Sequence, residues 1–444
     1  MPKERKERGD LECLSRIKQL PMHDLPLNRL RELGRDNPRE PAVRPYRYRM
    51  AIDNLQQRYV QGLLGNQQNA TARFEEADRF KLILAKSFLH RSDINLGALV
   101  SKLDEWLPAP WTSKYLWGYE EPLSPRQSSL LECLFTVEVI RRYTCGDSQD
   151  TADGLASVGL FAQARYDLIV HGNSPPFKAL EGIFYLAFPS YEASPVRNFM
   201  KLCIAFFNES MLIATDSQAS AAVNHLQQQM SSGSEIKDLL DLVRKCHAPL
   251  FPRQPPSDPM KLTAMRKANY LEEAGMSIRP ASNDTSVCSI HYREGRLEIP
   301  KLKINNQSEH LLMNLIQHEL EHYPNDSFIN DYLHFMDSLI DTEKDVDVLI
   351  HNNILDNYFT DSKGVATLLN KITSQAPLLP HTYYYNGISE AVNAYCSIPR
   401  HRWKATLRRD YCSSPWMIAS TIAAIILLVL TLIQTVCSII SAIK

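Results

Sequence analysis

Apolar residues recur at intervals of three and four along several stretches of the chain. This is the spacing of an amphipathic helix, in which one face packs on a core. The pattern predicts helices over residues 72–91, 128–143 and 328–340. We therefore expect a mainly α-helical fold.

One region instead shows the pattern of strands. The β-rich runs 287–292 and 296–304 flank Glu294 and Gly295. Two short β-rich runs joined around a glycine predict a β-hairpin. We expect this hairpin, at about residues 287–304, as a small β element within the helical domain.

Polar and proline-rich composition marks other segments. Residues 1–45 are rich in charge and proline, which predicts a loosely ordered arm ahead of a large helical domain over residues 46–412. Within that domain, the Ser- and Gln-rich residues 214–235 predict low order. The same holds for residues 247–260, which contain five prolines.

A long apolar run lies near the C-terminus. Residues 416–442 contain no charged side chain, and as a helix they are long enough to cross a hydrocarbon core of roughly 30 Å. The run predicts a transmembrane helix in a lipid bilayer, with Trp416 at the membrane interface.

Positive charge gathers on one side of this run. Basic residues precede it at Arg400, Arg402, Lys404, Arg408 and Arg409, whereas only Lys444 follows it. Because basic flanks tend to stay in the cytosol, we expect a single-pass, tail-anchored protein with a cytosolic helical domain, in the plasma membrane or an endomembrane. The same basic cluster suits contact with anionic lipid headgroups.

Five Asn-x-Ser/Thr sequons bear on this orientation. In the cytosol they would carry no sugar, whereas glycosylation would mean that the orientation is inverted. The sequons begin at Asn69, Asn208, Asn283, Asn306 and Asn325.

Charge and cysteine content narrow the function further. The 444 residues include 49 basic and 50 acidic side chains, and the net charge of −1 gives no global field to attract nucleic acid. Nine cysteines without a C-x-x-C pair favour a reducing compartment over a disulfide framework. We expect protein partners and no nucleic-acid partner.

Residues 318–322 spell H-E-x-x-H, the motif of zinc hydrolases. On a helix, His318 and His322 project from one face, and Glu319 can act as general base on a metal-bound water. Glu343 lies 21 positions after His322, at a spacing that suits a third ligand. The motif supports a membrane-anchored zinc peptidase as an alternative function.

A structural interpretation competes with the zinc site. His318 and His322 continue an apolar helix stripe with Leu311 and Leu315, as core or boundary residues do. Glu343 and Asp345 suit the first turn of a helix with Asp341 or Thr342 as its N-cap, because the helix dipole favours acids there. On this interpretation, which we prefer, the protein has no metal cofactor.

Several stretches resemble a plant family known as domain of unknown function 247. "SIHYREGRLEIPKLKINNQSEHLLMNLIQHE" is similar to its two strands, IP dipeptide and NLI-x-x-E helix, and "RWKATLRRDYCSSPWMIASTIAAIILLVLTLIQTV" resembles its membrane tail. The resemblance covers roughly residues 45–444 and implies a plant membrane protein without an established biochemical activity. Some grass members are associated with pollen-side self-incompatibility, which implies recognition or signalling rather than catalysis.

The chain departs from the family pattern at specific positions. Glu319 matches the family's helix glutamate, but His318 stands where an apolar residue is usual. In "DLIVHGNSPPF", Gly172 and Ser174 stand where Glu and Gln are usual. The positions that agree there are Asn173, Pro176 and Phe177. The resemblance therefore does not imply the histidine pair of the H-E-x-x-H motif.

Overall fold

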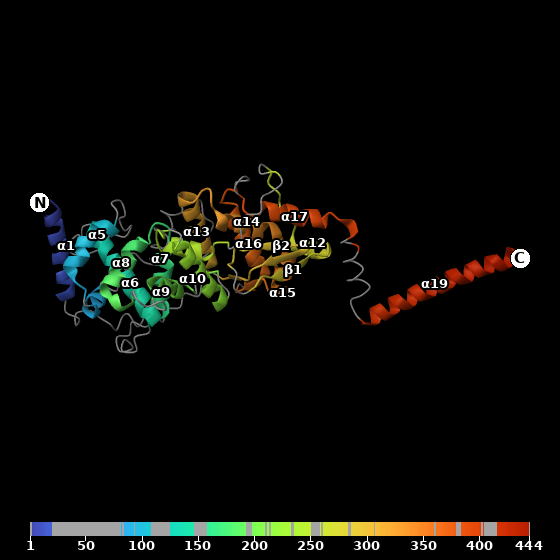
Figure 1. Ribbon diagram of the computed structural model, residues 1–444, viewed down its shortest axis with the longest axis horizontal. Coiled ribbons are helices and arrows are strands. Elements are labelled where there is room, and N and C mark those ends of the chain that lie inside the picture. The colour runs from blue at the N-terminus through green and yellow to red at the C-terminus, as the bar shows by residue number, and fades with distance from the viewer. Residues whose placement is uncertain are drawn as a thin grey trace, which may run out of the picture.

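The structure is a computed structural model in which the chain forms an elongated body, with helix α19 drawn apart from it (Figure 1). The residues that the structure describes are 2–19, 81, 84–92, 94–107, 125–145, 158–191, 198–208, 211–212, 215–231, 235–249, 258, 261–282, 286–305, 307–358, 361–378, 383–400, 403 and 415–443.

Helices from the first half of the chain form one end of the body (Figure 1). Helix α6 lies at their centre and contacts α8 and α9, and it covers the predicted helix 128–143. The helices of this half are α1 (Pro2–Gln19), α5 (Leu96–Trp106), α6 (Pro125–Cys145), α7 (Val158–Leu168), α8 (Phe177–Ala187), the 3-10 helix η3 (Pro189–Tyr191), α9 (Phe199–Phe207), α10 (Asp216–Ser231) and α11 (Leu239–Cys246).

Two segments expected to have little order are helical. Pro2–Gln19, from the expected N-terminal arm, forms α1, which buries Leu14 and packs against α5. Asp216–Ser231 forms α10, which buries Ala222 and Leu226 and contacts α9 and α11. Of the predicted helix 72–91, residues 84–91 are helical, and 72–80 lie outside the described residues.

The second half of the chain combines helices with two small sheets. Strands β1 and β3 pair in parallel and β3 and β2 antiparallel, while β4 and β5 form a separate parallel pair. The elements are α12 (Ala268–Glu273), β1 (Ser277–Pro280), β2 (His291–Arg293), β3 (Arg296–Ile299), β4 (Leu302–Ile304), α13 (Ser308–His322), α14 (Phe328–Leu339), α15 (Glu343–His351), β5 (Leu355–Asn357), α16 (Ser362–Thr373), α17 (Asn386–Cys396) and α19 (Pro415–Ile443).

The predicted hairpin exists but is shorter than expected. Glu294 and Gly295 connect β2 to β3 with φ angles of 43° and 81°, as in the tight hairpin turns that favour glycine. A Cβ atom on Gly295 would lie 2.5 Å from the Tyr395 ring, so no other residue fits there without rearrangement. The expected second strand, 296–304, divides between β3 and β4, which belong to different sheets.

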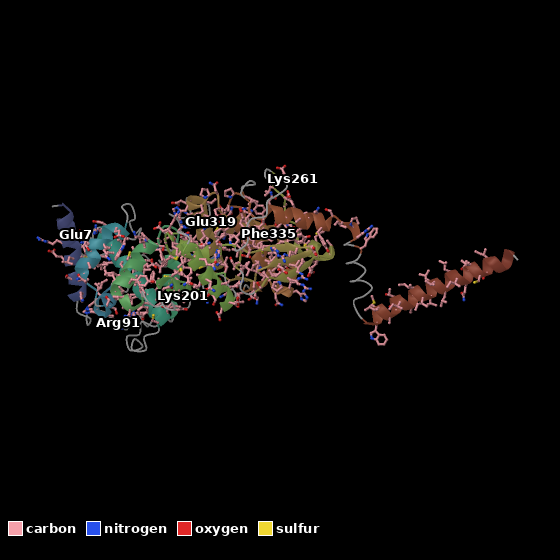
Figure 2. All side chains as sticks on the ribbon, viewed as in Figure 1. Glu7, Arg91, Lys201, Lys261, Glu319 and Phe335 are labelled. Atoms are coloured by element: carbon pink, nitrogen blue, oxygen red, sulfur yellow. The ribbon has the colours of Figure 1, made fainter. Side chains whose placement is uncertain are left out.

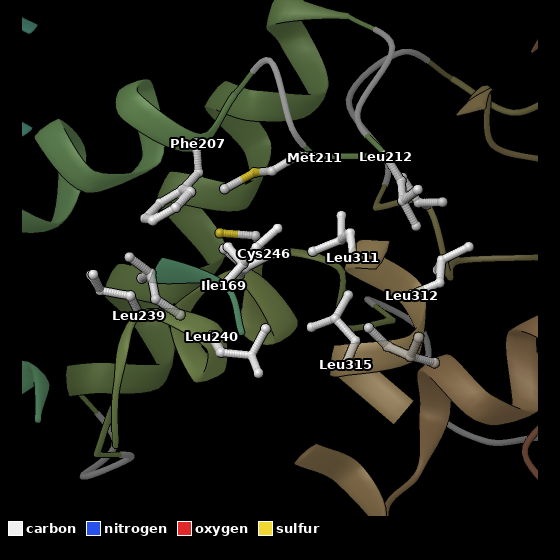
Figure 3. Packing of buried hydrophobic residues seen from close by; sticks show 14 of the residues in the cluster. Ile169, Phe207, Met211, Leu212, Leu239, Leu240, Cys246, Leu311, Leu312 and Leu315 are labelled. Carbon is white, nitrogen blue, oxygen red and sulfur yellow. The ribbon is translucent and has the colours of Figure 1, made fainter. Parts of the chain in front are cut away.

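The two halves share a hydrophobic core. Helix α11 packs against α13, and Figure 3 shows leucines of α13 facing apolar residues of the first half. The core residues at this junction include Ile169, Phe207, Met211, Leu212, Leu239, Leu240, Cys246, Leu311, Leu312 and Leu315, all buried. This junction positions the H-E-x-x-H helix, and Figure 2 labels Glu319 near the middle of the body.

Among the described residues, one helix is long and apolar enough to cross a membrane. Its span, Trp416–Ile439, has 24 residues, a mean hydropathy of 2.6 and no part buried inside the protein. It matches most of the predicted span 416–442, and Trp416 is 85 % exposed. Arg400 is exposed, whereas the rest of the basic cluster (Arg402, Lys404, Arg408 and Arg409) lies outside the described residues.

Candidate functional site

Helix α13 carries the H-E-x-x-H motif, as its pattern predicts. Before its first turn, the side chain of Asn305 accepts hydrogen bonds from the backbone N–H groups of Gln307 and Ser308. The helix ends at His322, directly before Tyr323 and Pro324. His318 and His322 lie one turn apart, with ring centroids separated by 4.7 Å.

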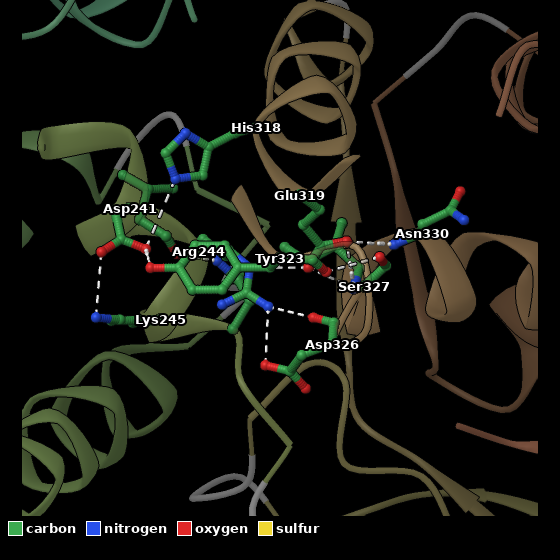
Figure 4. A network of polar contacts seen from close by, with 12 residues as sticks. Asp241, Arg244, Lys245, His318, Glu319, Tyr323, Asp326, Ser327 and Asn330 are labelled. Atoms are coloured by element: carbon green, nitrogen blue, oxygen red, sulfur yellow. Dashed lines mark hydrogen bonds and ion pairs between the residues drawn. The ribbon is translucent and has the colours of Figure 1, made fainter. Parts of the chain in front are cut away.

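Glu319 points away from the histidines and is fully buried. One of its oxygens accepts a hydrogen bond from Arg244 Nε at 2.9 Å. The backbone N–H groups of Ile329 and Asn330, in the first turn of α14, donate to the carboxylate at 2.9–3.1 Å. Glu319 thus joins α11 to the start of α14, where the helix dipole favours negative charge (Figure 4).

These contacts decide what Glu319 does chemically. Burial raises its pKa to about 7, although Arg244 and the two backbone N–H groups oppose that rise. A general base must reach the proton that it accepts, directly or through one water. Both oxygens of Glu319 already accept hydrogen bonds, and none of its surface is exposed. In this structure the carboxylate therefore links α11 to α14.

Arg244 completes the pairing on that side of α13. Its guanidinium also donates to the backbone oxygen and carboxylate of Asp326. It lies 4.0 Å from the ring centroid of Tyr323 and 4.1 Å from that of Phe328. A buried arginine with a carboxylate and two aromatic partners is well compensated for its lost hydration.

The other side of α13 faces acidic residues of α11. His318 is fully buried, and its Nε2 lies 3.7 Å from Asp241 Oδ1. Asp241 also accepts a hydrogen bond from Tyr323 and pairs with Lys245 at 3.1 Å. Burial alone would raise the pKa of Asp241, but His318, the backbone N–H of Lys237 and the Lys245 ammonium together hold it well below its usual value. A full negative charge therefore faces His318.

A third histidine joins this side of the helix. His171 lies in the loop between α7 and α8, and its backbone N–H donates to the Asn314 side chain of α13 at 2.8 Å. Gly172 follows with φ of 74°, a conformation in which glycine avoids the strain of a side chain. His171 Nε2 contacts Glu321 Oε2 at 2.7 Å.

The three histidines form one cluster. One ring nitrogen from each of His171, His318 and His322 lies within 4.8 Å of the corresponding nitrogens of the other two. His171 is 8 % exposed, His318 is fully buried and His322 is exposed. Burial lowers the pKa of His171 and of His322, so these rings are neutral at pH 7 and can offer a lone pair.

The third ligand expected from sequence is not part of this cluster. Glu343 is exposed in the first turn of α15, and α15 packs against α12, α16 and β5. Thr342 is the N-cap of that helix, and Asp345 completes a capping box with it. Glu343 therefore has the helix-start role that its acidic neighbourhood predicts. Sequence reasoning missed His171, Asp241 and Arg244.

Comparison with known proteins shows which protein family the chain resembles. A family profile described as "DUF247: Plant protein of unknown function" matches residues 63–430. The UPF0481 protein At3g47200 of Arabidopsis thaliana is 22% identical over 59% of this chain and 50% of its own length. A second Arabidopsis thaliana UPF0481 protein, At3g02645, is 25% identical over 37% of this chain and 31% of its own length.

The chain thus matches half or less of the length of each of these relatives. No solved structure matches significantly.

Proposed function

The chain belongs to DUF247, a plant family of unknown function, and from this premise we propose that it is a non-enzymatic, membrane-anchored recognition or signalling protein. Helix α19 holds the chain in a bilayer, and the helical body binds a protein partner. The role of Glu319 carries the proposal. The residue that would serve as catalytic base is instead a buried link between Arg244 and α14.

The membrane part of the proposal rests on helix α19. Its Trp416–Ile439 span is uncharged, and no part of it is buried by the described residues. Exposure of so much apolar surface to water is strongly unfavourable, whereas a bilayer solvates it. With the basic residues 400–409 on the cytosolic side, the body faces the cytosol.

Fractionation of plant cells that express the full chain tests the anchor and the orientation. The wild type should stay in the membrane pellet after alkaline carbonate extraction, and a form without residues 416–442 should leave it. In sealed microsomes, external protease should digest the body, and a glycosidase should cause no mobility shift. A protected, glycosylated body would contradict the cytosolic orientation.

The absence of peptidase activity is tested by Glu319→Gln. Purified wild type and the variant should hydrolyse a mixed peptide substrate no faster than a buffer blank, with or without added Zn²⁺. Zinc-dependent hydrolysis by the wild type that disappears in a folded Glu319→Gln protein would refute the non-enzymatic proposal.

A further inference from the structure

We propose that His171, His318 and His322 form a binding site for a divalent transition-metal ion, with Zn²⁺ as the preferred ion. The proposal goes beyond the membrane-anchored recognition function and does not depend on it. The ion would connect the loop after α7 to helix α13. It would serve as a structural or ligand-accepting centre, because the glutamate of the H-E-x-x-H motif is turned toward Arg244 and α14.

Ring positions are the first support. The three pairs of ring centroids lie 4.7, 5.6 and 5.8 Å apart. In a tetrahedral zinc site with Zn–N bonds of about 2.0–2.1 Å, imidazole centroids lie roughly 5 Å apart. The observed values bracket this distance, so small side-chain rotations bring all three rings into bonding range.

The second support is a set of buried nitrogens without a hydrogen bond. Both ring nitrogens of His318 and Nδ1 of His171 are buried and have no hydrogen-bond partner. Buried polar atoms are seldom left without one, because the loss of hydration is costly. An imidazole nitrogen that has no hydrogen bond can instead bind a metal ion through its lone pair.

Neighbouring carboxylates supply the third support. Histidines that bind metals usually donate their other ring N–H to a carboxylate, which fixes the tautomer and the ring orientation. Glu321 lies 2.7 Å from His171 Nε2, and Asp241 lies 3.7 Å from His318 Nε2. With Nε2 of His171 protonated toward Glu321, its unpartnered Nδ1 carries the lone pair for the metal. The two carboxylates also attract a cation.

The chemistry of the site follows from its exposure. Three imidazoles leave the fourth position of a tetrahedral ion open, and the exposed His322 places that position at the surface. A water or a side chain from a partner would occupy it. Because Glu319 is turned toward Arg244 and α14, the motif's glutamate is not directed at that water.

Cobalt titration of the full chain in detergent micelles tests the site, since tetrahedral Co²⁺ gives intense visible d–d bands and Zn²⁺ displaces it. The variants are His171→Ala and His322→Ala, and His351→Ala at an exposed histidine of α15 is the matched control. Wild type and control should bind one Co²⁺ per chain. Each of the two cluster variants should bind it at least 10-fold more weakly.

Two readouts keep the test decisive. Far-UV circular dichroism establishes that each variant is folded, and His322→Ala guards against misfolding of the less exposed His171→Ala. Zn²⁺ should raise the melting temperature of the wild type and the control but not of the cluster variants. A folded wild type without bound metal would overturn the proposal, as would Co²⁺ binding unchanged in both His171→Ala and His322→Ala.

Discussion

The two sides of helix α13 treat buried polar groups in opposite ways. On one side, Glu319 pairs with Arg244 and with backbone N–H groups of α14, so its acceptors are occupied. On the other side, His318 is equally buried, but neither ring nitrogen has a hydrogen-bond partner. The H-E-x-x-H spacing alone fits both a metal site and a structural role for these side chains. Their surroundings differ: the contacts of Glu319 stabilise the fold, whereas His318 is available to a ligand.

The largest expected effect comes from breaking the paired side. Glu319→Ala removes the buried carboxylate that pairs with Arg244 and leaves it the exposed carboxylate of Asp326. We expect a loss of about 3–5 kcal/mol of folding free energy. Urea denaturation of the full chain in detergent, followed by near-UV circular dichroism, measures the shift in the midpoint.

Glu321→Ala is the matched control on the same helix. The Glu321 side chain is 59% exposed and its partner is His171, so its removal should cost under about 1 kcal/mol. Equal losses in Glu319→Ala and Glu321→Ala would mean that the two sides of α13 do not differ as described.

Acid should destabilise the protein through buried neutral histidines. Burial lowers the pKa of His310, on α13, and of His247 to about 4. Because these values lie below the unfolded pKa of 6.5, the stabilisation is present above pH 6.5 and is lost as pH falls from 6.5 towards 4. Each histidine should cost up to about 3 kcal/mol at the acid end.

A histidine substitution isolates this effect. His310 stacks on Tyr166 with ring centroids 3.6 Å apart, so His310→Phe preserves the aromatic contact while it removes the titrating group. Its free energy of unfolding should fall less between pH 6.5 and 4 than that of the wild type or of His351→Ala. Parallel profiles for all three proteins would contradict the prediction.

A smaller effect separates the two acids at the start of α15. Asp345 accepts hydrogen bonds from Thr342 and from the backbone of Asn269, so Asp345→Ala should cost about 1 kcal/mol or more. Glu343 is exposed, so Glu343→Ala should lower the folding free energy by under about 0.5 kcal/mol. If the same urea titration measured a larger loss for Glu343→Ala than this, Glu343 would contribute to stability and the prediction would be wrong.

Little change in stability is also expected on the side of α13 that carries His318. Without metal, His318→Leu replaces two nitrogens that have no hydrogen bond by apolar atoms of similar volume. Asp241 keeps Tyr323 and Lys245 as partners, so stability should stay within about 1 kcal/mol of the wild type. Glu319→Ala, at the adjacent position, should by contrast cause a large loss of folding free energy. A loss above 3 kcal/mol in metal-free buffer would contradict this prediction and show that the contact of His318 with Asp241 stabilises the fold.

Regular periodicity made part of this fold predictable. Helices α6 and α14 follow from apolar spacing, and the hairpin follows from β-rich runs around Gly295. Helix α10 was missed because Ser and Gln dominate its composition. Its apolar residues Ala222 and Leu226 nevertheless lie four apart on the buried face, which is the signal that could have found it.

The candidate site was only half predictable. His318 and His322 are four apart on one helix, so their proximity is written in the sequence. His171 lies 150 positions before Glu321 and approaches α13 only because its loop is bound by Asn314. Nothing local distinguishes such a histidine. The spacing of Glu343 suited a ligand, but helix capping explains that acid without a metal.

The parallel pairing of β4 and β5 has a consequence for proteolysis. Leu302 pairs with Leu355, although α13, α14 and α15 separate the two strands along the chain. The turn at residues 324–326 between α13 and α14 is exposed, so a protease can cut there. Both fragments would remain associated through the strand pair and the helix contacts. The nicked protein would elute as one species under native conditions and separate only in denaturant.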